Sequence, residues 1–240
     1  MTDDPADIEP GVPPPTASRV AARALVLAVV SCRGFIDTDA ADAGDLWTRI
    51  EAWFSRLALN GELEEWEKAF IAKPLGTLED RERIDATWLS EGLLVLAWAL
   101  GRYGMPPYDQ PIVAAEVTDA LGLLKPDAET VLAKRSLRSP SELEDFRQDI
   151  FAINWRLREF RVTGQPIDFA TVAKTAWFGS LSLARVRLVD GDLAIGATRI
   201  DKTDKRMFHR CASIVQERHR AINWLLGDSS KIYSEVGTST

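Results

Sequence analysis

The sequence predicts a mainly α-helical protein, built as a single globular domain with one small β-hairpin before its last helix. Apolar residues recur at three- and four-residue spacing along most of the chain, as at Val20, Ala24, Leu27 and Val30. Recognisable start and stop residues bound these helical segments. Only the stretch LARVRLVDGDLAIGATRI alternates apolar and polar residues instead. With 240 residues, the chain is long enough to bury a sizeable core.

Residues 1–16 are expected to form a disordered tail, because PADIEPGVPPP is rich in acid and proline. Residues 17–240 are expected to form the helical domain, since no linker or internal repeat divides them. The first expected helix begins at Ala17. The other expected helices cover Asp45–Leu59, Glu62–Ala72, Thr77–Leu100, Val113–Leu124, Pro126–Arg135, Pro140–Gly164 and Thr203–Leu226.

Capping residues set several of these boundaries. Thr77 with Asp80 predicts a capping box, and Ser139 followed by proline and then Glu142 predicts another helix start. Gly164 is expected to end that second helix. The segment LLVLAWAL is apolar on every side, which predicts a helix buried all round at the centre of the fold.

The alternating stretch predicts the hairpin. Asp190-Gly191 has the turn chemistry of a two-residue hairpin loop, with strands expected at Leu183–Val189 and Leu193–Thr198. Two strands alone are marginally stable in water, so the hairpin must pack on the helices. The eight tryptophans are expected to serve mostly as core anchors between helices.

Glu91 and Arg218 each fall on an apolar helix face. The apolar neighbours are Ile84, Trp88, Val95 and Trp98 for Glu91, and Ile214, Val215 and Ile222 for Arg218. A buried carboxylate is costly without a partner, and a buried arginine cannot lose its proton. We therefore predict that these two side chains meet as a bidentate ion pair.

Two roles stay open for this pair. A buried ion pair can simply fix the register of two central helices. Alternatively, His219, Glu217 or Asn223 converge on it to form a polar pocket for an anionic or amide-bearing ligand. On this hypothesis Glu91, Arg218, His219, Glu217 and Asn223 are the ligand-binding candidates, while no residue is assigned a catalytic role. Arg220 is expected to point toward solvent.

Charge argues against nucleic acid as a partner. The net charge is -7 and the isoelectric point about 5.0, with four acidic residues in the tail. The basic residues Lys202, Lys205, Arg206 and Arg210 are diluted by neighbouring aspartates. A nucleic-acid-binding surface normally shows a clustered basic footprint.

No cofactor or metal is expected. The sequence has no glycine-rich phosphate loop and no nucleophile elbow. Cys32 and Cys211 have no metal-ligand spacing, and His209 and His219 would lie about 15 Å apart along one helix. The N-terminus lacks a secretory signal, and no apolar run reaches the roughly 20 residues needed to cross a bilayer. We expect a cytoplasmic protein with reduced thiols and no membrane contact.

Three segments carry a resemblance to a known family. They are ERHRAINWLLG, with Glu217, Arg218, His219, Ala221, Asn223, Trp224 and Leu225; TWLSEGLLVLAWALG, with Trp88, Glu91, Trp98, Ala99, Leu100 and Gly101; and RVAARALVLAVV, with Arg23. They resemble the bacterial family catalogued as domain of unknown function 4272, over roughly residues 17–240. The chain departs from the family at Ala152 and Asn154, where an arginine and a histidine are usual, and at Ser239, which replaces an aspartate. The resemblance implies a helical intracellular domain and supplies no activity.

These observations favour a non-catalytic interaction or scaffold module, with a protein as its possible partner. The alternative is an enzyme or small-ligand-binding protein with a polar pocket around Glu91, Arg218 and His219. Nothing in the sequence indicates an oligomeric state.

Overall fold

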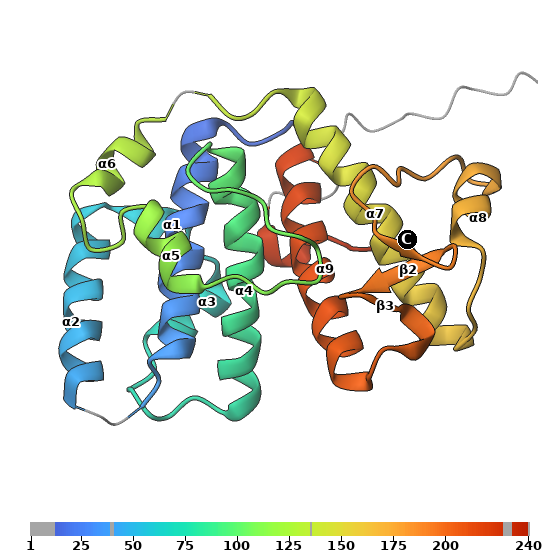
Figure 1. The fold of residues 1–240 in the computed structure, drawn as a ribbon. Helices are drawn as coiled ribbons and strands as arrows, with labels where there is room; N and C mark the ends of the chain where they lie inside the picture. Colours follow the sequence, from blue (N-terminus) through green and yellow to red (C-terminus); the bar gives the residue numbers. More distant parts are fainter. Residues whose placement is uncertain (1–12, 39–40, 135, 228–231, 240) are drawn as a thin grey trace, which may run out of the picture.

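Helices build most of the chain, as a computed structural model of residues 13–38, 41–134, 136–227 and 232–239 shows (Figure 1). Within these ranges the α-helices are α1 (Ala17–Phe35), α2 (Ala41–Arg56), α3 (Glu65–Ile71), α4 (Asp80–Ala99), α5 (Ala114–Ala120), α6 (Asp127–Leu132), α7 (Pro140–Thr163), α8 (Phe169–Thr175) and α9 (Lys205–Leu226). A three-stranded antiparallel sheet precedes α9. The predicted fold class, a mainly helical single domain, is confirmed. Of the tail expected at residues 1–16, residues 1–12 lie outside the described ranges.

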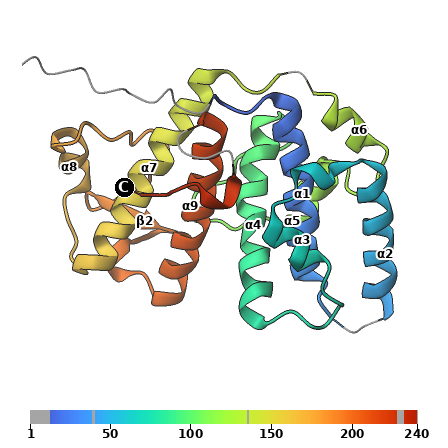
Figure 2. The same ribbon diagram turned by 180° about the vertical axis from the view of Figure 1, so that it is seen from behind.

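The central helices stand side by side in the order α1, α4, α9 and α7 (Figures 1 and 2). The second half of α4 is buried on all sides, as its sequence predicts, with every residue from Leu93 to Leu100 in the core. The middle of α1, from Ala24 to Val30, is equally buried. Helix α4 packs against both α1 and α9, and the burial of these apolar segments stabilises their packing.

Helix starts follow local capping chemistry, with one correction. Ser139 caps α7, accepting a hydrogen bond from the backbone N–H of Glu142 at 3.2 Å. The cap predicted at Thr77 is wrong, because the Thr77 hydroxyl donates to the carbonyl of Pro74 at 2.7 Å. Glu79 is the N-cap of α4 instead. Glu79 and Glu82 form a reciprocal capping box there, an arrangement in which each satisfies an N–H left free at the helix start.

The hairpin turn is confirmed, but the strands are shorter than expected. Strand β1 (Leu188–Val189) pairs with β2 (Asp192–Ile195) across Asp190-Gly191, both of which have positive φ, at 49° and 78°. A second turn at Gly196, with φ 65°, folds β3 (Thr198–Arg199) back onto β2. The predicted strand Leu193–Thr198 is therefore two strands, because glycine readily adopts the left-handed conformation that the turn requires.

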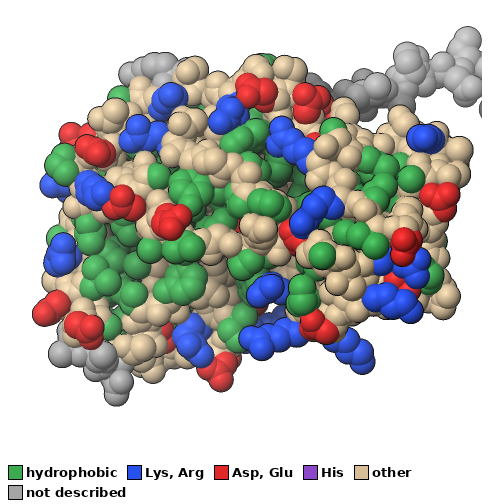
Figure 3. All heavy atoms as spheres, viewed as in Figure 1, with side chains coloured by type: hydrophobic (Ala, Val, Ile, Leu, Met, Phe, Trp, Pro, Cys, Tyr) green, Lys and Arg blue, Asp and Glu red, His purple; other side chains and the backbone are tan. Residues whose placement is uncertain are grey.

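Tryptophans divide between core and surface. Trp47, Trp53, Trp98 and Trp224 are buried. Trp66 and Trp177 are 41% and 94% exposed, so the expectation that most tryptophans anchor the core holds for only part of the set. Basic and acidic side chains are mixed on the face shown in Figure 3. No helix in the described ranges is both long enough and apolar enough to cross a membrane.

Candidate functional site

The structure brings Glu91 of α4 and Arg218 of α9 together. Both residues are at most 2% exposed. Nε and Nη2 of Arg218 donate to the same carboxylate oxygen, Oε2 of Glu91, at 3.0 and 2.8 Å. The other oxygen, Oε1, accepts from the backbone N–H of Ile112 at 3.1 Å. The predicted pair is confirmed, although the two N–H groups share one oxygen rather than binding one each.

The apolar stripe predicted around Glu91 is only partly buried. Val95 and Trp98 of the expected stripe are buried, but Ile84 is 50% exposed. Helix α4 enters the core only from Ala86 onward, so its first turns lie against solvent on several sides. Glu91 is buried because it lies in the second half of the helix, where every face is covered.

Arg218 has no free N–H group left. Nη1 donates to the carbonyls of Pro106 and Pro107 at 3.2 and 3.0 Å, and Nη2 donates to the carbonyl of Gln110 at 2.8 Å. With the two bonds to Glu91, all five donors of the guanidinium are used. Burial lowers the pKa of Arg218, and the Glu91 carboxylate counteracts that effect. The pair therefore fastens α4, α9 and the connection at residues 106–112 to one another.

Three more arginines form ion pairs of the same kind, which the sequence reasoning missed. The pairs are Arg23 with Glu67, Arg33 with Asp37, and Arg156 with Asp192, and all three arginines are at most 1% exposed. Like Arg218, each also donates to backbone carbonyls in a connecting segment, as Arg156 does to Gln165 at 3.0 Å. Their apolar flanks, as in RVAARALVLAVV for Arg23, were the available signal. Buried arginines that form hydrogen bonds between helices and connecting segments are thus a repeated feature of this fold.

His219 and Asn223 face the end of the chain rather than the Glu91–Arg218 pair. Nδ1 of His219 lies 3.0 Å from Nδ2 of Asn154, and that same amide donates to the carbonyl of Thr238 at 3.1 Å. Asn223 donates to the carbonyl of Gly237 at 3.0 Å. Burial, with smaller contributions from nearby arginines, lowers the pKa of His219 to about 4. These side chains hold residues 236–239 against α7 and α9.

The same C-terminal segment is anchored by Tyr233. Its ring packs edge-on against Trp224, with centroids 5.8 Å apart, and the Arg23 guanidinium lies over it. The Tyr233 hydroxyl fits against Gly92 of α4, where a Cβ atom would come within 2.0 Å of the oxygen. This close approach requires glycine at position 92.

Glu217 lines an open cavity of about 720 Å³ between α3, α4 and α9. Both of its carboxylate oxygens accept from Nη1 of Arg220 at 2.7 Å. The sequence predicts that Arg220 points to solvent; its side chain is 21% exposed and reaches solvent only through the open cavity. Burial raises the pKa of Glu217, Arg220 opposes this, and the negative charges of Asp85 and Glu91 add to the rise.

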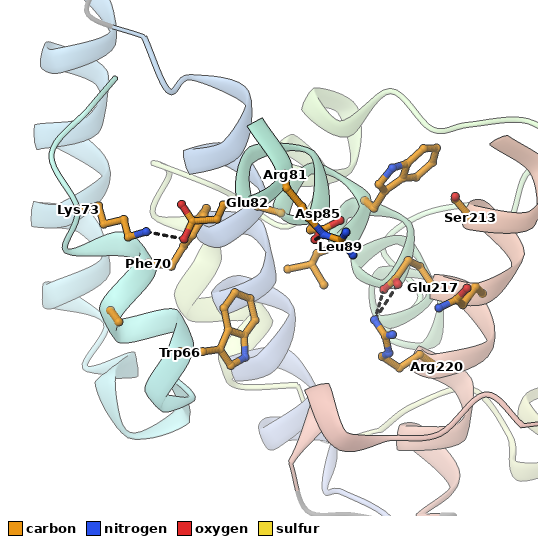
Figure 4. A pocket seen from close by; sticks show the side chains of 14 residues that line it. Trp66, Phe70, Lys73, Arg81, Glu82, Asp85, Leu89, Ser213, Glu217 and Arg220 are labelled. Atoms are coloured by element: carbon orange, nitrogen blue, oxygen red, sulfur yellow. Dashed lines mark hydrogen bonds and ion pairs between the residues drawn. The ribbon is translucent and has the colours of Figure 1, made fainter. Parts of the chain in front are cut away.

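Aromatic and aliphatic side chains form much of the cavity wall. Trp66 lies on the side opposite Glu217 and Arg220, with Leu89 between them (Figure 4). Phe70 packs edge-on against Trp66, at 6.2 Å between centroids. The rim carries the ion pairs of Lys73 with Glu82 and of Arg81 with Asp85. This combination admits an apolar side chain with polar groups around it, in a volume typical of binding pockets.

The two cysteines are free thiols of low reactivity. Cys32 and Cys211 are free, and burial raises the pKa of both thiols, that of Cys211 to about 12. A thiol with a raised pKa remains protonated and is a weak nucleophile. Among the residues described, no three histidine, cysteine, aspartate or glutamate side chains gather in a group that could hold a metal ion.

Comparison with known proteins identifies a family. One family model matches residues 7–177, which include Arg23 and the segment TWLSEGLLVLAWALG but not ERHRAINWLLG. None of the curated proteins and none of the solved structures matches the chain. Because the match covers well over half of the 240 residues, the chain belongs to the family described as Domain of unknown function (DUF4272).

Proposed function

We propose that this protein is a non-catalytic interaction module of the cytoplasm that binds a partner protein in the cavity between α3, α4 and α9. One contrast carries the proposal. The polar centre at Glu91 and Arg218 is closed, with every guanidinium N–H already bound within the chain. The cavity beside it is open to solvent and has Trp66 and Trp88 among its lining residues.

The lining has the chemistry of a protein-binding hot spot. Tryptophan and arginine are enriched at such positions, because they bury a large area and still offer a polar group. Trp66, Trp88 and Leu89 provide apolar surface, while Glu217 and Arg220 are partly shielded from water beside them. A partner that inserts an apolar side chain toward Leu89 and presents polar groups to the rim fits this arrangement.

The state of the reactive groups supports a non-catalytic role. With a pKa of about 4, His219 is neutral at physiological pH, and its Nδ1 is engaged with Asn154. Both thiols have raised pKa values, which disfavours the thiolate. Reduced, unpaired Cys32 and Cys211 also suit a cytoplasmic location.

Site-directed photo-crosslinking in the source cells tests the proposal. A photoreactive residue at Ala69, an exposed position on the cavity lining, should trap a defined partner. The matched control is Ala52, an exposed alanine on α2. Trp66→Ala should lower the yield of the Ala69 product without unfolding the protein, since Trp66 is partly exposed. Equal trapping at Ala69 and Ala52, or no effect of Trp66→Ala, would reject the cavity as the binding surface.

A small-ligand or enzymatic role around Glu91, Arg218 and His219 is the second candidate. One observation favours it: Arg218 also borders a cleft of about 310 Å³, together with Tyr108, Phe146 and Arg187. Native mass spectrometry of the protein purified from its source distinguishes the two proposals. A retained small molecule, lost in Phe146→Ala, supports the second candidate. A retained protein partner, lost in Trp66→Ala, supports the interaction module.

A further inference from the structure

A smaller cleft lies between α7 and α9, and its only charged lining residues are two arginines. Its volume is about 260 Å³, and it is lined by Asn154, Leu157, Arg158, Arg161, Ala212, Gln216 and Thr238. None of these lining residues is acidic, although the chain as a whole carries a net charge of -7. The cleft's two arginines, Arg158 and Arg161, are exposed and face no carboxylate in the lining, whereas the buried arginines described above are each paired with an acid.

Helix geometry places the basic side chains together. Asn154, Arg158 and Arg161 are four and three residues apart, so they share one face of α7. That face lies against α9, where Ala212 and Gln216 are also four residues apart. The segment ending near Thr238 crosses from α9 to α7 beside the cleft (Figure 2). The cleft is thus built from two long helices and a tail that both of them hold.

Most N–H groups of the two exposed arginines have no acceptor within the described part of the chain. Among the described residues, Arg158 makes one hydrogen bond, from Nη1 to the carbonyl of Thr238 at 2.9 Å. The same described part of the chain contains no hydrogen bond or ion pair to Arg161, nor a side-chain hydrogen bond to Gln216. Two guanidinium groups can therefore still supply several N–H donors toward one small acceptor.

Electrostatics favour a negatively charged occupant. Like charges one turn apart on a helix repel each other, and here no acid on the facing helix compensates. The positive field reaches the neighbouring His219, where Arg158 is one of the groups that lower the imidazole pKa. An anion between Arg158 and Arg161 would relieve the repulsion and accept hydrogen bonds from N–H groups that otherwise face solvent.

We propose that this cleft binds a small phosphoryl oxyanion through the guanidinium groups of Arg158 and Arg161, with the Gln216 amide as a neutral donor. Planar guanidinium groups match the oxygens of phosphate in a two-point arrangement. The volume suits free orthophosphate or a small phosphate monoester, and it is below the usual range for drug-sized ligands. The site shares only Gln216 with the lining of the cavity of the proposed function, and the phosphate proposal does not depend on that function.

Isothermal titration calorimetry with inorganic phosphate, and separately with glycerol 2-phosphate, tests the proposal at low ionic strength. The wild type should bind one equivalent, and Arg161→Gln should weaken binding about tenfold or more, as expected for lost bonds to a charged group. Arg206→Gln, which removes an exposed arginine from the first turn of α9, is the matched control and should bind as the wild type does. Tighter binding of one compound identifies the source of the phosphoryl group.

Arg158→Gln is not used as a test variant, because it would also remove the hydrogen bond from Arg158 to the carbonyl of Thr238. The second measurement is therefore made on the wild-type protein. In NMR spectra, phosphate should shift the backbone amides of Ala212, Gln216 and residues 236–239, and added chloride should weaken the effect by screening. No saturable binding of either compound would overturn the proposal. So would equal losses in Arg161→Gln and Arg206→Gln, or shifts that map outside the cleft.

Discussion

Removing the charge of Arg218 should leave Glu91 as an unpaired buried carboxylate that destabilises the fold. Substituting Glu91 as well should then restore part of the lost stability. Arg218→Met keeps much of the side-chain volume but leaves Glu91 buried, at 2% exposure, without its cation. It also takes donors away from the carbonyls of Pro106, Pro107 and Gln110. Glu91→Leu in the same chain then removes the stranded carboxylate but cannot return those donors.

The magnitude follows from these contacts. Stranding one partner of a buried pair costs about 3 to 5 kcal/mol. Each of the three part-buried carbonyls adds about 1 kcal/mol, the low end for a polar group that loses its partner. Arg218→Met should therefore lower the free energy of unfolding by about 6 kcal/mol or more. The double variant should regain about 2 kcal/mol and stay about 4 kcal/mol below the wild type, because the three carbonyls and the Ile112 N–H that bound Glu91 remain unpaired.

Urea unfolding followed by far-ultraviolet circular dichroism measures these differences as a double-mutant cycle. The exposed pair of Arg81 and Asp85, whose side chains are 90% and 65% exposed, is the control. Arg81→Met and Asp85→Leu should combine additively there, because water screens the two charges. The reasoning fails if adding Glu91→Leu to Arg218→Met lowers stability further, or if the exposed pair shows the same coupling.

Three other predictions follow from local geometry. Gly92→Ala should destabilise the protein strongly, because its Cβ would lie 2.0 Å from the Tyr233 hydroxyl oxygen. Adding Tyr233→Phe should restore part of the stability, because the nearest remaining ring atom, Cζ, is 3.3 Å from that Cβ. Thermal unfolding of the single and double variants measures both effects. His219 binds a proton more readily in the unfolded chain, where its pKa is 6.5, than in the fold, where it is about 4. The free energy of unfolding should therefore fall as the pH drops from 6.5 toward 4, by about 2 kcal/mol at pH 5. Chemical unfolding of His219→Asn at the same pH values should not show this loss. The same pH slope in the variant and the wild type would contradict the lowered pKa of His219. Trp177→Ser should change the free energy of unfolding by no more than about 0.5 kcal/mol, since the side chain is 94% exposed; a larger loss in urea unfolding would mean that Trp177 packs against the fold.

Local patterns predicted the helices other than α8, together with one contact between distant parts of the chain. The apolar run in α4 and the apolar arc around Arg218 in α9 predicted that a carboxylate and a guanidinium would be buried together. That inference succeeds because a charge in a covered helix segment has few ways to avoid the cost of burial. Capping at Ser139 and the turn at Asp190-Gly191 likewise depend only on a few neighbouring residues, so they could be predicted from the sequence.

Other features depend on segments that meet only in the folded chain. The carbonyls of Pro106 and Gln110 that complete the Arg218 site belong to a connection with no periodic pattern. The contacts of His219 and Asn223 with residues 237–238 arise because the chain folds back across α7 and α9. By itself, the sequence determined which side chains must leave water, since periodicity fixes the buried face of a helix. Tertiary structure decided which partners they find there, because the path of a loop is set by packing against surfaces distant in sequence.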